Sequence, residues 1–178
     1  MSDRNRKTAA EEAYAYLAAR MRTRAEVERR LKDRGYESGE IAEALSELDS
    51  LGYIDDYQYA LRYYEYNREK RRGSGRAARE LAEKGLDPEV IRNAREDFLY
   101  SEKVDEYADA LEAAEKEVLL RAGSGIAEGG DSEETPLASV MDERLSAKIA
   151  RKLDGKGFDR GDIYRVLEEL RRRYGSCE

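Results

Sequence analysis

Histidine and tryptophan are absent from this 178-residue chain, and cysteine occurs once, at Cys177. The chain therefore cannot form an internal disulfide, a Cys/His metal site or a nucleophile activated by histidine. No apolar run approaches the ~20 residues of a membrane span, and the basic start is not followed by an apolar stretch of the signal-peptide type. We expect a cytoplasmic protein with no membrane segment. Because the residue types that most enzymes use are scarce, we also expect no metal site and no catalytic activity.

Proline is scarce as well, occurring only as Pro88 and Pro136, so little interrupts the long tracts of Ala, Glu, Arg, Leu and Lys. These residues are strong helix formers, which predicts an all-α protein. Charged residues make up 41% of the chain. Small helical units with large exposed surfaces tolerate such a load better than one compact globule does.

The net charge of −7 argues against binding nucleic acid through bulk charge alone. The charge nevertheless alternates in sign along the chain, which indicates distinct faces. The net charges of successive segments are +4 for 1–36, −7 for 37–61, +4 for 62–84, −12 for 85–143 and +4 for 144–178.

One pattern occurs three times along the chain: an apolar residue, Leu four positions later, then a base, a glycine and another apolar residue. It predicts a helix with a buried i, i+4 stripe, a cationic last turn and a glycine C-cap. The copies are Val27-Leu31-Arg34-Gly35-Tyr36, Ala77-Leu81-Lys84-Gly85-Leu86 and Ile149-Leu153-Lys156-Gly157-Phe158.

Periodic apolar residues predict a further helix before each copy, and another after it. The three preceding helices are expected to run through Ala13, Tyr57 and Val104. Ser38, Asp87 and Asp159 are the expected N-caps of the later helices. A capping box over Thr23–Glu26 and a cap at Ser74 begin the middle helices of the first two copies.

Repeated sequence motifs of this kind predict three tandem three-helix repeats over residues 8–54, 55–101 and 102–174. We expect them to stack into an elongated, curved array with a right-angled or crescent-like form. The third repeat contains an insertion over about 122–139, rich in Gly, Ser and acid, without apolar periodicity. We interpret this insertion as a loosely ordered acidic linker, with an autoinhibitory or contact role as the alternative.

Basic residues recur around the middle helix of every repeat and are the candidate binding residues, able to meet phosphates or an acidic protein surface. The alternative is that they are solvated helix faces. They are Arg20, Arg22, Arg24, Arg29, Arg30, Lys32 and Arg34; Arg68, Lys70, Arg71, Arg72, Arg76, Arg79 and Lys84; and Lys148, Arg151, Lys152 and Lys156.

Two other features have a structural interpretation. Asp55-Asp56 is typical of an N-cap followed by a first-turn acid, and nothing indicates the cleft that a catalytic carboxylate pair needs. Among 13 tyrosines, we expect Tyr36, Tyr53 and Tyr59 to pack in the core or between repeats, while exposed tyrosines can anchor an interface.

The junction between the first two repeats resembles the signature of the bacterial RecX family, regulators of the RecA recombinase. The residues that carry the resemblance are Leu51, Gly52, Tyr53, Ile54, Asp55, Asp56, Tyr59 and Ala60. The flanking Tyr16–Tyr36 and Gly75–Leu86 stretches are similar too, and residues 144–174 match more loosely. The resemblance covers residues 8–100 best.

This resemblance implies a monomer, without a cofactor or catalysis of its own, that lodges in the groove of the RecA–DNA filament. It implies inhibition of RecA ATP hydrolysis, strand exchange and coprotease activity, with contact to single- or double-stranded DNA left open. A helix-turn-helix-like DNA-binding protein that does not depend on RecA is the alternative. A purely structural helical scaffold is a third possibility.

Overall fold

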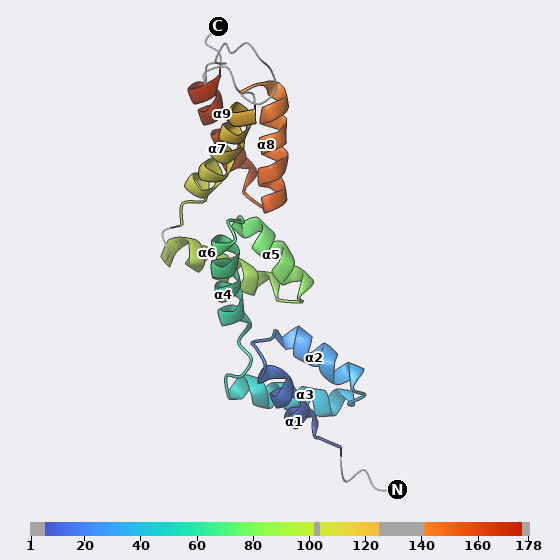
Figure 1. Cartoon of the computed structure of the whole chain (residues 1–178). Coiled ribbons are helices and arrows are strands. Elements are labelled where there is room, and N and C mark those ends of the chain that lie inside the picture. The colour runs from blue at the N-terminus through green and yellow to red at the C-terminus, as the bar shows by residue number, and fades with distance from the viewer. Residues whose placement is uncertain (1–5, 102–103, 125–140, 176–178) are drawn as a thin grey trace. The chain divides into compact units, whose positions relative to one another are not determined.

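The computed structural model describes residues 6–101, 104–124 and 141–175 of the chain (Figure 1). Every regular element in this described part is an α-helix, which confirms the expected fold class. The helices are α1 (Ala9–Leu17), α2 (Arg24–Asp33), α3 (Ser38–Ser50), α4 (Asp56–Glu69), α5 (Ser74–Glu83), α6 (Pro88–Ser101), α7 (Glu106–Ser124), α8 (Glu143–Lys156) and α9 (Arg160–Tyr174).

These helices form two compact units, each with its own internal contacts. The first comprises Met1–Glu65 and Ala78–Phe98, and the second comprises Tyr66–Ala77 and Leu99–Glu178. Both α4 and α5 therefore contribute residues to each unit. Of the insertion expected over 122–139, residues 122–124 end α7, and the remainder lies outside the described residues.

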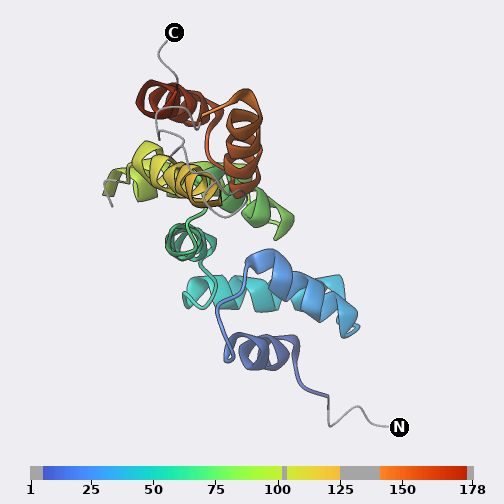
Figure 2. The ribbon, with the colours of Figure 1, turned by 45° about the horizontal axis from the view of Figure 1, so that its top comes forward.

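In the first unit, α1, α2 and α3 pack against one another (Figure 2). Their core contains the predicted i, i+4 stripe of α2, Val27 and Leu31, both fully buried. Ala13 from α1 and Leu48 from α3 are also fully buried in it. The apolar side of each short helix thus faces the other two, as amphipathic periodicity requires.

The tyrosines of the first unit follow the prediction only in part. Tyr36 is buried, as expected, and its hydroxyl donates to the carbonyl of Lys7. The core tyrosine of α4 is Tyr64, which is 1% exposed, stacks on Phe98 and donates its hydroxyl to the carbonyl of Ile91. The prediction for Tyr53 is wrong, because this side chain is 57% exposed. It meets Tyr14 edge to face instead, with ring centroids 5.0 Å apart.

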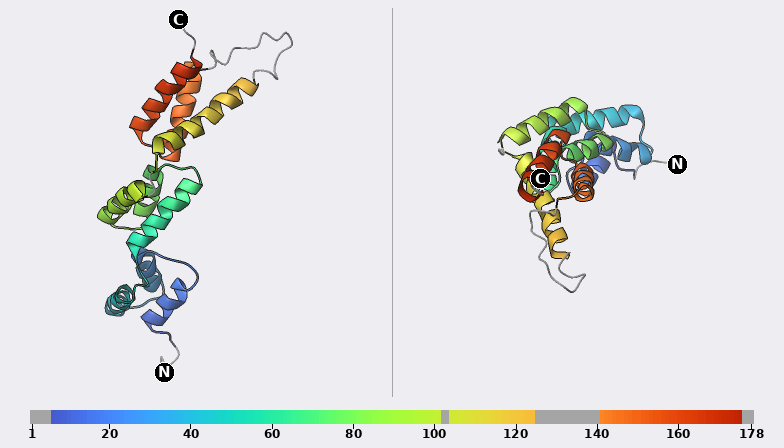
Figure 3. Two further views of the ribbon diagram at one scale, coloured as in Figure 1. Left: turned by 90° about the vertical axis from the view of Figure 1, so that its left-hand side faces the viewer. Right: turned by 90° about the horizontal axis from the view of Figure 1, so that it is seen from above.

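In the second unit, α7, α8 and α9 lie side by side as a small bundle (Figure 3). The third copy of the stripe, Ile149 and Leu153, is buried there with Val118, Val166 and Leu170. Helix α7 begins at Glu106, so Val104 precedes the helix that was predicted to include it.

The glycine C-caps are confirmed in all three repeats. Gly35, Gly85 and Gly157 have φ of +76°, +84° and +83°, the left-handed region in which glycine carries no steric penalty. The N–H of the apolar residue after each glycine donates to the carbonyl of the stripe leucine, which closes a Schellman motif. Arg71, with φ of +54°, ends α4 in the same way without a glycine.

Two of the predicted N-caps, Ser38 and Ser74, are wrong, whereas the other predicted caps are confirmed. The capping box of Thr23 with Glu26 is confirmed, as are the N-cap at Asp159 and the side-chain cap of Asp87 on the N–H of Glu89. Ser38 is not the N-cap of α3, because Glu37 occupies that position and exchanges capping bonds with Glu40. Ser74 is already the first residue of α5.

Candidate partner-binding surface

Several predicted cations of the first repeat hold its helices together. Glu12 of α1 is 13% exposed and pairs with both Arg30 and Arg34 at 2.9 and 3.4 Å. The guanidinium of Arg22 lies over the Tyr16 ring, 4.3 Å from its centroid, a favourable cation–π distance. These cations stabilise the contact of α2 with α1, so only part of each side chain remains for a partner.

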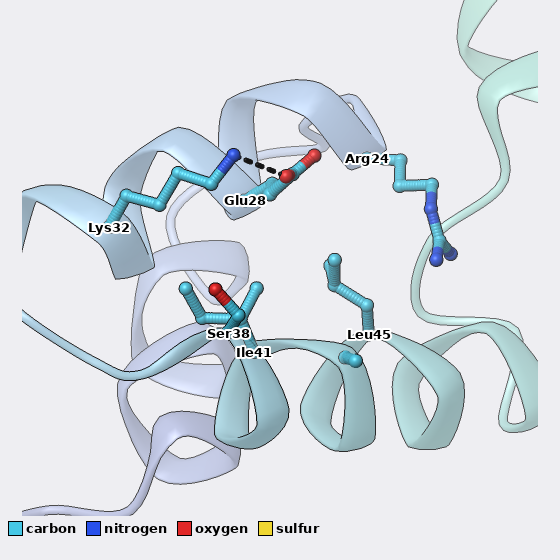
Figure 4. A pocket seen from close by; sticks show the side chains of 7 residues that line it. Arg24, Glu28, Lys32, Ser38, Ile41 and Leu45 are labelled. Atoms are coloured by element: carbon cyan, nitrogen blue, oxygen red, sulfur yellow. Dashed lines mark ion pairs between the residues drawn. The ribbon is translucent and has the colours of Figure 1, made fainter.

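A shallow groove of about 260 Å³ runs between α2 and α3 (Figure 4). Ile41 and Leu45 of α3 face it, and Lys32 on its rim reaches to Glu28 at 2.5 Å. Arg24, at the other end of the groove, pairs with Asp49. Both rim cations are thus already paired, in bonds that are solvent-exposed and individually weak.

Cations of the second repeat are divided between the two units. In the second unit, Arg68 pairs with Asp109 at 3.6 Å and Arg71 with Glu112 at 2.5 Å. Arg76 donates to the carbonyl of Gly155, and Lys70 lies over the ring of Tyr66.

In the first unit, Lys84 bonds to Glu26 and lies near the rings of Tyr59 and Tyr63. Burial lowers the pKa of Lys84, but Tyr59 and Glu26 outweigh that effect and raise it overall. Lys84 is therefore a packed, charged contact between α5 and its neighbours α2 and α4.

In the third repeat, Glu117 of α7 is 5% exposed and binds two lysines of α8, Lys148 at 3.2 Å and Lys152. The hydrogen bond from Lys152 is the main reason that the pKa of Glu117 lies below its ordinary value. The pKa of Lys156, a base, also lies below its ordinary value, but for a different reason. Burial is the main cause, and the neighbouring positive charges of Lys152, Arg71 and Lys116 lower the pKa further. This cation has no ion pair among the described residues.

Three predicted arginines occupy the same place in every repeat. Arg29, Arg79 and Arg151 each lie two residues after the first apolar residue of the repeated pattern and two before its leucine, on the solvent side of the middle helix. All three are exposed, and none makes an ion pair within the described residues. Arg20 and Arg72 are likewise without an ion pair in that part of the chain.

The junction motif is mainly structural. Ile54 and Ala60 are buried, and Gly52 takes a positive φ of 71°, whereas Leu51 is 58% exposed. Tyr59 is half-buried and stacks on Tyr63.

Asp55 accepts from the N–H of Gln58 at 2.9 Å, which confirms its predicted role as N-cap of α4. Asp56 is in the first turn, as predicted, but its carboxylate accepts from the N–H of Arg24 on α2. Burial raises the pKa of Asp56, and this bond opposes the rise.

Sequence reasoning missed the acids that organise these cations. Glu12, Glu112 and Glu117 each hold two basic side chains. The only available signal was their helical spacing opposite the bases, which does not distinguish an interhelical partner from a solvated acid. No group of three or more His, Cys, Asp or Glu side chains in the described part is arranged to hold a metal ion. None of the described helices combines the length and apolarity that crossing a bilayer requires.

Three-helix segments joined by capped glycine turns, with a recurring basic middle helix, define the class of this protein as a helical-repeat protein. Residues 9–48 match the family model of the first three-helix domain of RecX. The chain is 31% identical over 172 residues to regulatory protein RecX of Amycolatopsis mediterranei, which covers 96% of this chain and 87% of that protein. It is 38% identical over 106 residues to regulatory protein RecX of Bacillus licheniformis, where the match spans 39% of that protein and 58% of this chain.

The fold is similar to the crystal structure of RecX from Lactobacillus salivarius, with a TM-score of 0.70 and 26% identity. That match covers 91% of this chain and 94% of that one. The chain belongs to the RecX family of regulatory proteins.

Proposed function

We propose that this protein binds the RecA–DNA filament and inhibits RecA ATP hydrolysis, strand exchange and coprotease activity. It would do so in the cytoplasm as a monomer, without a cofactor and without catalysis of its own. Membership of a family of regulatory proteins supports this proposal. So does the scarcity of the residue types that catalysis uses.

The observation that carries the proposal is the recurrence of Arg29, Arg79 and Arg151. A filament offers the same acidic or phosphate-bearing surface repeatedly, and these arginines occur once in each repeat of this chain. These three arginines are exposed and make no ion pair in the described part of the chain. The Nε of Arg151 donates to the carbonyl of Ala147 at 3.3 Å. The Nη groups of the three arginines can form bidentate bonds to carboxylate or phosphate.

The test is to add the purified protein to RecA assembled on single-stranded DNA and to follow ATP hydrolysis. We expect hydrolysis to fall as the protein is added. Unchanged hydrolysis at several-fold excess over filament ends would contradict the proposal.

A charge-reversal variant tests the three arginines. We expect the combination R29E, R79E and R151E to raise the concentration needed for half-inhibition by roughly tenfold or more, since tenfold corresponds to only about 1.4 kcal/mol. The matched control reverses three exposed cations outside the predicted clusters, as K7E, R160E and R171E, which changes the net charge equally. Equal weakening by both variants would show that only total charge matters.

A further inference from the structure

Two hydrogen bonds that each involve a main-chain group connect the first repeat to the second, and both lie within the first unit. The hydroxyl of Thr23 donates to the carbonyl of Lys84 at 3.1 Å. Lys84 directly precedes the glycine that ends α5. The N–H of Arg24, the first residue of α2, donates to Oδ1 of Asp56 at 2.9 Å. The first repeat thus hydrogen-bonds to the glycine turn of the second repeat, and the second repeat caps helix α2 of the first.

The same two contacts connect the second repeat to the third, within the second unit. The N–H of Gly73 donates to the carbonyl of Lys156 at 3.0 Å. The N–H of Ser74, the first residue of α5, donates to Oε1 of Glu106 at 2.6 Å, and its hydroxyl donates to Oε2 at 2.8 Å. Gly73, Ser74 and Glu106 lie 50 positions after Thr23, Arg24 and Asp56, so equivalent residues make equivalent bonds.

The corresponding turn of the first repeat is covered too. Arg6 donates from Nη2 to the carbonyls of Arg34 at 3.2 Å and Gly35 at 2.7 Å. Its guanidinium also lies over the ring of Tyr36, 4.5 Å from the centroid. In every repeat, therefore, the carbonyl before the glycine is bonded by the stretch of chain that precedes the repeat.

The two adjacent acids at each junction accept hydrogen bonds from different helices. Asp55 and Asp105 accept from the N–H groups of Gln58 and Ala108, on the helices that they themselves begin. Asp56 and Glu106 reach the preceding repeat instead. The first N–H groups of a helix have no partner within that helix. A carboxylate from the following repeat therefore satisfies donors that would otherwise depend on water.

We propose that Asp56 and Glu106 are coupling residues, through which the middle helix of one repeat is stabilised by the folding of the next. At the glycine turn of the first repeat, Arg6 makes the contact that a preceding repeat makes at the other two turns. This inference does not depend on RecA or on any partner. It assigns the second acid of the junction motif a role distinct from that of the first.

Amide hydrogen exchange of the full chain, followed by NMR, tests the assignment with a pair of neighbouring substitutions. In Asp56→Ala we expect the protection of the Arg24 N–H to fall about tenfold or more, because its charged acceptor is lost. The protection of the Gln58 N–H should stay unchanged. In Asp55→Ala we expect the reverse pattern. Glu106→Ala should expose the Ser74 N–H in the same way.

Asp56→Asn supplies the rescue, because its side-chain oxygen still accepts a hydrogen bond. We expect the Arg24 N–H to keep its protection in that variant. Unchanged Arg24 protection in Asp56→Ala would overturn the proposal. So would equal loss at Arg24 and Gln58 in both alanine variants, which would indicate general destabilisation.

Discussion

Gly35, Gly85 and Gly157 share one backbone conformation but differ in their surroundings. An added Cβ at Gly35 would meet only the tip of Arg6, at 3.8 Å. At Gly85 it would meet the Cβ of Ala25 at 2.6 Å. At Gly157 it would lie closer than 3.0 Å to the backbone of Arg76, which cannot move aside easily. The turn at Gly35 therefore has space for an added methyl group, whereas the turns at Gly85 and Gly157 do not.

This difference predicts a graded series of alanine substitutions. We expect Gly35→Ala to lower the free energy of unfolding by about 1–2 kcal/mol, the cost of a left-handed residue with a Cβ. Gly85→Ala and Gly157→Ala should cost a further ~1–3 kcal/mol for overpacking. Urea denaturation of the three variants measures this, and similar losses at all three positions would show that close packing adds nothing.

Helix α9 contains a local charge cluster with a definite pH dependence. Glu169 accepts from Arg172 at 3.0 and 2.6 Å and also from Arg173 one residue later. The bonds from Arg172, and then those from Arg173, lower the pKa of Glu169 to about 2 from 4.5. Because the pKa is lower in the folded state, the unfolded chain binds more protons between these two values.

The stabilisation from Glu169 should therefore be complete above about pH 4.5 and disappear as the pH falls toward about 2. We expect the melting temperature of Glu169→Gln to lie below that of the unsubstituted chain at pH 7. The gap should close over that acidic window. Thermal unfolding followed by circular dichroism measures it, with Glu96→Gln, an exposed acid on α6, as control. A gap that does not change with pH would contradict the assignment.

The sequence was sufficient to predict those helix ends that depend on local chemistry. The capping box at Thr23, the cap at Asp159 and the three glycine turns need only neighbouring residues, and all are confirmed. Ser74 and Tyr53 could not be predicted in the same way. Ser74 is the residue whose N–H and hydroxyl meet Glu106, an acid 32 positions away, and Tyr53 meets Tyr14. Such contacts depend on tertiary packing.

For the candidate surface, too, the sequence predicted local features but not those that depend on tertiary packing. Composition and repetition identified the basic residues, but not which of them are already paired. Arg30 and Lys152 bind acids on other helices, whereas Arg29 and Arg151 do not have such partners in the described part. Deciding between these cases requires knowing which helix faces meet. The assignment of any of these cations to a partner remains a prediction.

The net charge of −7 for the entire chain predicts how it behaves with naked DNA. Three arginines contacting phosphates would give a slope of about −3 in a plot of log affinity against log salt. We expect affinity for duplex DNA weaker than ~10⁻⁴ M at physiological salt, the weak end of non-specific binding. Fluorescence anisotropy with labelled duplex over a salt series measures both. A slope of about −6 or steeper would favour the helix-turn-helix-like alternative.

The junctions between repeats have one consequence for how such a chain diverges after duplication. The carbonyls of Lys84 and Lys156 and the N–H groups of Arg24, Gly73 and Ser74 belong to the main chain. Most amino acids carry such groups, except that at Gly73 an added Cβ would lie 2.4 Å from the carbonyl oxygen of Gly157. Most substitutions at these sites leave the donor or acceptor in place. The donor to the carbonyl can itself vary, because Thr23 uses its hydroxyl for Lys84 and Gly73 uses its N–H for the equivalent Lys156. Duplicated segments can therefore lose recognisable similarity to each other while their attachment is inherited intact.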